Sequence, residues 1–160
     1  MVDQAGHAAS PACAAGRRPG GTLAGGHPIH AHNTEYAVTR DLEAPFDEVV
    51  SRVREELAQE GFGVLTEIDV RSTLKEKLDL DVPEYVILGA CNPNLASRGL
   101  ALEPDLGVLL PCNVVVRRDG EHTHVAAMEP LAALRLARNP ALEPLAQEAR
   151  ERITRAVERL

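Results

Sequence analysis

The chain has 160 residues, enough for one domain with its own core, and its 44% hydrophobic and 26% charged residues are typical of a globular protein. Only 2% of the residues are aromatic, so the core must be aliphatic, and recognition by stacking on aromatic platforms is disfavoured. Residues 1–33 carry one aspartate and two arginines, a net +1, so the formal charge of −7 leaves −8 on residues 34–160, which argues against nucleic acid and anionic membranes as partners.

Several features indicate a cytoplasmic protein. No run approaches the roughly 20 apolar residues of a membrane span, and the N-terminal region lacks the apolar core of a signal peptide. The three cysteines Cys13, Cys91 and Cys112 are too few for a disulfide framework. They fit a reducing compartment, where thiols stay free.

Residues 1–33 differ in composition from the rest of the chain. They are rich in alanine, glycine, proline and histidine and show neither strand nor helix periodicity. Such a segment cannot bury enough apolar surface to order itself, which predicts a disordered tail. A mis-assigned start codon is the alternative explanation. The folded domain is expected at 34–160.

Residues 36–70 predict a strand, a helix and a second strand. The segment 36–42 is rich in strand formers and is followed by an Ala-Pro pair. The next apolar residues recur at helical spacing up to Gly61 and predict an amphipathic helix; they are Phe46, Val49, Val50, Val53 and Leu57. Residues 63–70 alternate, which predicts a strand with Val64, Thr66, Ile68 and Val70 on one face and Leu65, Glu67 and Asp69 on the other.

Residues 74–128 predict a short polar helix followed by several strands. The apolar run 85–90 is typical of a buried strand and leads directly into Cys91-Asn92-Pro93. Because asparagine caps helices and proline fits the first turn, a brief helix through 95–102 should follow. Residues 106–116 predict one or two strands interrupted at Pro111, and Asp119-Gly120 predicts a hairpin turn to a strand at 122–128.

The chain closes on a long amphipathic helix. Its apolar residues recur every three or four positions, with arginine and glutamate between them; they are Leu142, Leu145, Ala149, Ile153, Ala156 and Leu160. The order of strand, helix, several mostly antiparallel strands and a final helix predicts an α+β fold rather than a repeating βαβ pattern.

Three segments carry a resemblance to a known family. They are EIDVRSTLKEKL at 67–78, YVILGACNP at 85–93 and GVLLPCNVVV at 107–116. Together they resemble the domain-of-unknown-function family DUF302, over roughly residues 35–160. The resemblance implies a β-α-β(4)-α fold shaped like the TATA-binding protein, with a curved antiparallel sheet of about four to six strands. It also implies a bacterial or archaeal protein that forms dimers. It implies no reaction, because shape does not carry function.

Two Cys-Asn pairs are the most conspicuous candidates for a functional site. Cys91 lies between a strand end and a helix start, where the helix dipole would favour the thiolate. Alternatively, it is a small buried hydrophobe. Pairing of the two strands would bring Cys112 close, which suggests thiol exchange or soft-metal binding, although two cysteines do not complete a tetrahedral zinc site. A small-molecule cleft is predicted to be lined by Cys91, Asn92, Pro93, Cys112 and Asn113.

Other polar residues carry weaker signals. His122 and His124 should point to one face of a strand, but no third metal ligand is identifiable, so a solvated face is favoured. The histidines His27, His30 and His32 lie in the tail, where nothing would hold a metal geometry. Glu67 and Asp69 form a carboxylate pair that a neighbouring arginine would neutralise.

Three functions remain open. The first is a non-enzymatic module that binds a small molecule or a partner at the cysteine cleft. The second is a thiol redox or metal-handling protein that uses Cys91 and Cys112. The third is a structural homo-oligomer, most simply a dimer. No standard enzyme motif and no cofactor motif occurs in the chain, so an enzyme is the less favoured expectation and no cofactor is predicted.

Overall fold

The computed structural model describes residues 34–160. The predicted tail at 1–33, with Cys13, His27, His30 and His32 among its residues, lies outside the described residues. Within the described part, none of the helices has both the length and the apolarity that a membrane crossing requires.

The described part has five strands and five α-helices. The first half contains β1 (Ala37–Leu42), α1 (Phe46–Gln59), β2 (Gly63–Asp69), α2 (Val70–Leu78), β3 (Tyr85–Cys91) and α3 (Pro93–Leu102). The second half contains the 3₁₀ helix η1 (Pro104–Leu109), β4 (Cys112–Asp119), β5 (His122–Met128), α4 (Pro130–Leu134), the 3₁₀ turns η2 (Arg135–Ala137) and η3 (Pro140–Leu142), and α5 (Glu143–Glu158).

The strands form one antiparallel sheet in the order β1-β5-β4-β3-β2. Four strands follow α1 and precede α5, so the β-α-β(4)-α order is present, with α2, α3 and α4 as additional short helices. The predicted α+β fold with an antiparallel sheet and a long C-terminal helix is therefore confirmed.

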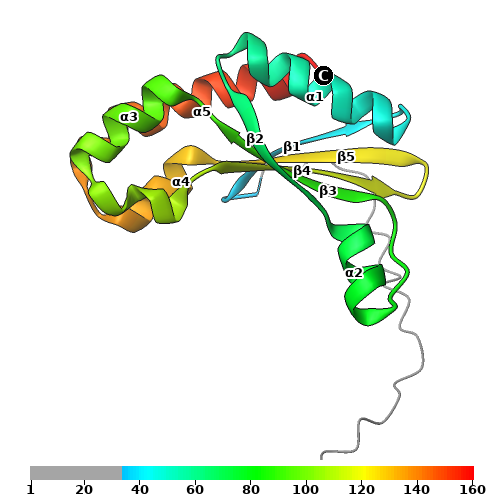
Figure 1. Cartoon of the computed structure of the whole chain (residues 1–160). Helices are drawn as coiled ribbons and strands as arrows, with labels where there is room; N and C mark the ends of the chain where they lie inside the picture. Colours follow the sequence, from blue (N-terminus) through cyan, green and yellow to red (C-terminus); the bar gives the residue numbers. More distant parts are fainter. Residues whose placement is uncertain (1–33) are drawn as a thin grey trace, which may run out of the picture.

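The helices cover one face of the sheet. Figure 1 shows α1 and α5 along this face, with α3 and α4 at one end and α2 projecting beyond the end of β2. Alternate residues of the central strands point toward the helices and are buried; they include Val86, Leu88, Val114, Val116 and Val125. Each full burial of such a side chain contributes roughly 1.5–3 kcal/mol. Figure 1 shows no helix running along the other face of the sheet; α2 is drawn below the strands, at the end of β2.

The two long helices follow from their apolar stripes. In α1 the buried residues Val49, Val53 and Leu57 are four apart and lie on one face. Asp47 and Glu48 lie in its first turn, where carboxylates interact favourably with the helix dipole. After α1 the chain turns at Gly61, whose φ of +81° is a conformation that side chains disfavour.

A buried carboxylate joins the end of α1 to α5. The side chain of Glu60 accepts hydrogen bonds from Arg155 (2.8 Å) and Arg159 (2.8 Å). The Arg155 guanidinium is the largest cause that holds the pKa of Glu60 below its ordinary value, and Arg159 acts in the same direction while burial opposes them. This ion-pair cluster fixes the corner where α1, α5 and the sheet meet.

The strand predicted over 106–116 is wrong in its first half. Pro104–Leu109 form the 3₁₀ helix η1, and β4 begins only at Cys112, after a cis Leu110–Pro111 peptide bond. The physical reason is the burial of Leu106, which is 2% exposed and packs so close to Gly99 that a Cβ there would lie 2.5 Å from it. A helical turn that starts at a proline buries this one side chain without the alternation of a strand.

The two faces predicted for residues 63–70 are also corrected. β2 ends at Asp69, whose side chain caps α2, so Val70 belongs to the helix. A register shift between Val64 and Thr66 inserts an extra residue into β2. Val64 therefore pairs with Ala90 on the helix-covered face, whereas Ile68 pairs with Ile87 on the open face.

Candidate functional site

The two Cys-Asn segments meet at one end of the sheet. β3 pairs with β4 so that Ala90 lies opposite Cys112, which places the two cysteines on adjacent strands, one residue out of register. Both thiols line the same enclosed cavity of about 30 Å³, here called the cysteine chamber. Its other walls are almost entirely apolar; they include Leu95, Leu106, Met128, Leu134, Leu145 and Ala149.

The cysteine chamber is smaller than a typical ligand pocket. Its volume of about 30 Å³ lies well below the roughly 300–1,000 Å³ of such pockets. Of the five residues predicted to line the cleft, Cys91, Asn92 and Cys112 do line the chamber. Pro93 is an exposed residue at the start of α3, and Asn113 is exposed on the strand position next to Cys112, so it points to the opposite face of the sheet.

Asn92 has a structural role. It is 6% exposed, and its Oδ1 accepts hydrogen bonds from the backbone amides of Asn94 (3.1 Å) and Leu95 (3.2 Å). Its Nδ2 donates to the carbonyl of Glu60 at 3.4 Å. The predicted cap of α3 is therefore confirmed. Because these contacts use both ends of the amide, Asn92 has little capacity left for a ligand.

The pKa values of both thiols are raised, whereas the helix dipole predicts a lowered pKa for Cys91. Burial raises the pKa of Cys91, and burial together with the nearby Cys91 raises the pKa of Cys112 to about 11. Burial disfavours the charged thiolate here, and the start of α3 does not reverse this effect. Both side chains are therefore neutral thiols near pH 7.

The histidines do not form a metal site with their neighbours. His124 Nδ1 lies 2.6 Å from Asp41 Oδ1 across the β5–β1 pair, and both side chains are 16% exposed. His122 pairs in register with Asp119. Within residues 34–160 there is no group of three or more histidine, cysteine, aspartate or glutamate side chains that could hold a metal ion.

The carboxylates of β2 already have partners. Glu67 forms an ion pair with Arg54 of α1, rather than with the neighbouring arginine that the sequence suggested. Asp69 accepts hydrogen bonds from the amide (2.8 Å) and hydroxyl (2.6 Å) of Ser72 and so caps α2. The pair therefore serves the fold rather than acid-base chemistry.

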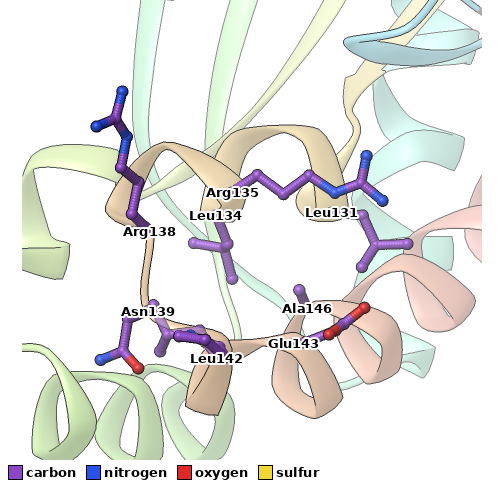
Figure 2. Close-up of a pocket in the computed structure, with 9 residues that line it drawn as sticks. Leu131, Leu134, Arg135, Arg138, Asn139, Leu142, Glu143 and Ala146 are labelled. Carbon is purple, nitrogen blue, oxygen red and sulfur yellow. The ribbon is translucent and has the colours of Figure 1, made fainter.

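A second cavity lies between α4 and the start of α5. It has a volume of about 250 Å³, just below the range typical of ligand sites, and is here called the basic pocket. Figure 2 shows its side chains as a ring around a hollow, with Leu134 pointing inward. The lining consists of Leu131, Leu134, Arg135, Arg138, Asn139, Pro140, Leu142, Glu143 and Ala146.

The charged residues of the basic pocket lie on its rim. Arg135 extends along the side that carries Leu131, and Arg138 stands at the opposite side with its guanidinium group directed away from the hollow (Figure 2). Both arginines are exposed, and neither forms a hydrogen bond through its guanidinium or an ion pair with any residue of 34–160. Arg138 also adopts a positive φ of 52°, which costs a non-glycine residue roughly 1 kcal/mol or more.

What distinguishes this pocket is that its two unpaired arginines flank one cavity. On α3 and α5 nearby, arginines are paired, as Arg98 is with Glu148 (2.8 Å) and Arg150 with Glu129 (3.1 Å). Asn139 is also engaged, because its Nδ2 donates to the carbonyl of Leu102 at 3.2 Å. The free donors at the mouth are therefore the two guanidinium groups.

Two larger hollows, of about 710 and 490 Å³, flank the start of α1. Most of their charged residues are acidic. Glu84 lies 3.8 Å from Arg118, and the carboxylates of β2 have the partners described above. Their larger volumes are lined by more charged and fewer aliphatic side chains than the basic pocket, so they offer less apolar surface to a ligand.

The sequence reasoning missed Arg135 and Arg138. They belong to none of the motifs that the sequence analysis identifies. The signal that could have found them is two arginines three apart between Pro130 and Pro140, in a region of net charge −8. Prolines at both ends predict short helical turns, which bring both side chains to one surface.

The comparisons with known proteins agree on one family. The family model described as "Domain of unknown function DUF302" matches residues 38–160. The crystal structure of an uncharacterized conserved DUF302 protein from Bacillus stearothermophilus superimposes with a TM-score of 0.74 and 33% sequence identity, over 79% of this chain and 98% of that chain. No curated protein matches. With the match over residues 38–160 and the likeness of fold, the chain belongs to the DUF302 family, a family of unknown function.

Proposed function

We propose that the protein is a small-molecule-binding module and that its ligand is a small organic anion held in the basic pocket. The observation that carries the proposal is the pair of unpaired guanidinium groups, Arg135 and Arg138, at the mouth of an apolar cavity of about 250 Å³. The sequence predicts a binding cleft at the cysteine motifs, whereas this proposal places the ligand in the basic pocket. The reason is that the cysteine chamber, at about 30 Å³, is too small to admit such a ligand.

The chemistry of the lining favours an anion with an apolar body. Guanidinium groups bind carboxylates through two parallel charge-assisted hydrogen bonds, and the leucines of the floor favour hydrocarbon. Glu143 lies on the same rim, so the mouth carries two positive charges and one negative charge. A net charge of +1 suits a monoanion better than a multiply charged ligand.

Calorimetric titration with a panel of small organic acids tests this function. We expect binding to the wild type and a loss of about five- to tenfold in affinity for each of Arg135→Gln and Arg138→Gln, because each removes one charge-assisted hydrogen bond. Arg71→Gln is the matched control, since Arg71 is an exposed arginine on α2, outside the basic pocket. Equal affinity in all four proteins, or no binding by any acid, would reject the proposal.

A second candidate function is thiol chemistry at the cysteine chamber. The observation that favours it is that Cys91 and Cys112 line one cavity and that Cys91 perturbs the pKa of Cys112. Mild oxidation followed by mass spectrometry tests it. One intramolecular disulfide between the two residues supports a redox role, whereas separate oxidation of each sulfur without a bridge argues against it.

We also propose that the protein works in the bacterial cytoplasm as a homodimer. The open face of the sheet supports the dimer, because one row across all five strands is mostly apolar; it consists of Thr39, Ala126, Val115, Ile87 and Ile68. Ile68 is 50% exposed in the monomer. Light scattering of the wild type and of Ile87→Lys tests this assembly, and a wild-type monomer would reject it.

A further inference from the structure

The basic pocket and the cysteine chamber share one lining side chain. Within residues 34–160, Leu134 is the only residue that lines both cavities, and it is 7% exposed. It belongs to α4, which packs against α5. In Figure 2 its side chain projects toward the middle of the basic pocket. Leu134 therefore forms both the floor of one cavity and a wall of the other.

The neighbouring residues alternate between the two cavities. On α4, Pro130 lines the cysteine chamber and Leu131 lines the basic pocket. On α5, Leu145 lines the chamber and Ala146 the pocket. The seam between α4 and α5 is thus the partition, and Leu134 is the side chain that closes it.

The space behind Leu134 suits hydrocarbon and no polar group. Leu106, Leu145 and Met128 line it, and the two cysteines there are neutral thiols. Small apolar cavities of this kind stay dry and accept apolar ligands. No aromatic side chain lines the basic pocket itself, so its floor offers no ring-stacking surface and fits a flexible aliphatic chain.

We propose that Leu134 determines ligand specificity by setting the length of the ligand's aliphatic tail. The ligand class is an unbranched aliphatic carboxylate. Its carboxylate binds Arg135 and also Arg138, once the exposed Arg138 side chain turns toward the hollow, and its tail runs down the pocket until it contacts Leu134. This inference rests on the proposed function and adds to it the chemical class of the ligand and the residue that limits its size.

The mechanism predicts how affinity depends on chain length. Each methylene buried in the pocket should raise affinity about fourfold. The gain stops at the acid whose terminal methyl group reaches Leu134, because a longer tail must remain in water or displace the leucine. In Leu134→Ala the tail gains the space of about two to three carbons and opens into the chamber, so the optimum should move to longer acids by about that number.

The experiment measures the affinities of the unbranched carboxylates from butanoate to decanoate for the wild type and Leu134→Ala. Leu134→Val, a smaller truncation, replaces Leu134→Ala if circular dichroism shows that the alanine variant does not fold. The matched control is Leu136→Ala, because Leu136 is 74% exposed two positions along the chain and lines neither cavity. Cys91→Leu in the Leu134→Ala background should refill the chamber and return the optimum toward that of the wild type.

The outcomes separate this inference from the proposed function. A shift of the optimum toward longer acids in Leu134→Ala, absent in Leu136→Ala and reversed by Cys91→Leu, supports it. An unchanged optimum with carboxylate binding retained overturns the role of Leu134 and leaves the basic pocket as the binding site. Failure of the wild type to bind any carboxylate overturns both.

Discussion

The cysteine chamber and the basic pocket lie on the two sides of Leu134, and they differ in which of their polar groups are satisfied. At the chamber, Asn92 uses its amide to cap α3 and to bind the carbonyl of Glu60. At the pocket, Arg135 and Arg138 have no partner within residues 34–160. The sequence motif thus marks a region that stabilises the fold, and the unpaired charges mark the region where we propose that a ligand binds.

An unusual motif at the end of a strand can either stabilise the fold or bind a ligand. The hydrogen-bond partners of its residues distinguish these two roles. A motif residue whose donors and acceptors are all engaged inside the protein stabilises the fold. A charged residue that faces an apolar hollow without a partner is available for a ligand. The predictions that follow examine each side of this contrast.

The largest expected effect is that of Asn92→Ala. It removes the cap of α3 and leaves the carbonyl of Glu60 without its donor, so we expect a loss of about 3 kcal/mol in the free energy of unfolding. Asn113→Ala is the matched control from the second motif, because Asn113 is exposed and should change stability by less than about 0.5 kcal/mol. Urea denaturation measures both. Equal losses in the free energy of unfolding of the two variants would contradict the structural role assigned to Asn92.

The second effect concerns thiol reactivity. The pKa of Cys112 is raised from 9.0 to about 11, so near pH 8 its thiolate should be about a hundredfold scarcer than that of an ordinary cysteine. Cys91 is only half-buried, and we expect it to be alkylated first. Residue-resolved alkylation against pH, read by mass spectrometry, measures the rates. A Cys112 thiolate that forms below pH about 8 would restore the reactive-thiol hypothesis.

The third effect is a dependence of stability on pH at the Glu60 corner. The arginines lower the pKa of Glu60 in the folded protein below its ordinary value of 4.5. The unfolded chain therefore binds the proton more readily, so this stabilisation is present above pH 4.5 and is lost as the pH falls through the lower folded-state pKa. Urea midpoints over this range should fall less in Glu60→Gln than in the wild type. Parallel pH profiles would show that Glu60 contributes nothing to this dependence.

The smallest expected effect is a gain. Glu143→Gln removes the one carboxylate from the rim of the basic pocket, so affinity for hexanoate should rise about two- to fivefold. The rise should shrink with added salt, because exposed charges are screened. Titration calorimetry at two salt concentrations measures it. A weaker affinity in this variant would mean that Glu143 contacts the ligand directly and that the ligand carries a positive group as well.

Much of the fold follows from local sequence signals. The apolar stripe that contains Val49, Val53 and Leu57 predicts α1 because helical spacing alone places these side chains on one face. The strand expected around Leu106 is wrong because this segment forms a helical turn. That turn depends on the packing of Leu106 against Gly99, which the spacing of apolar residues does not report. The extra residue in β2 is likewise set by pairing with β3.

The candidate site was less predictable for a related reason. Asn92 could be identified as a cap from its position before a proline. The burial that raises the thiol pKa values depends on α3, α4 and α5 covering the strand ends, which no local pattern reports. Arg135 and Arg138 become significant only once the cavity between α4 and α5 is known, because its lining residues come together through the packing of these helices.

The most direct test of the central claim is the mapping of amide chemical-shift changes by nuclear magnetic resonance while hexanoate is added. We expect the changes to lie in residues 131–146, around Arg135, Arg138 and Glu143, and to disappear in the Arg135→Gln, Arg138→Gln double variant. Changes centred on Cys91–Asn92 and Cys112–Asn113, unaffected by the double variant, would contradict the claim and return the binding site to the cysteine motifs.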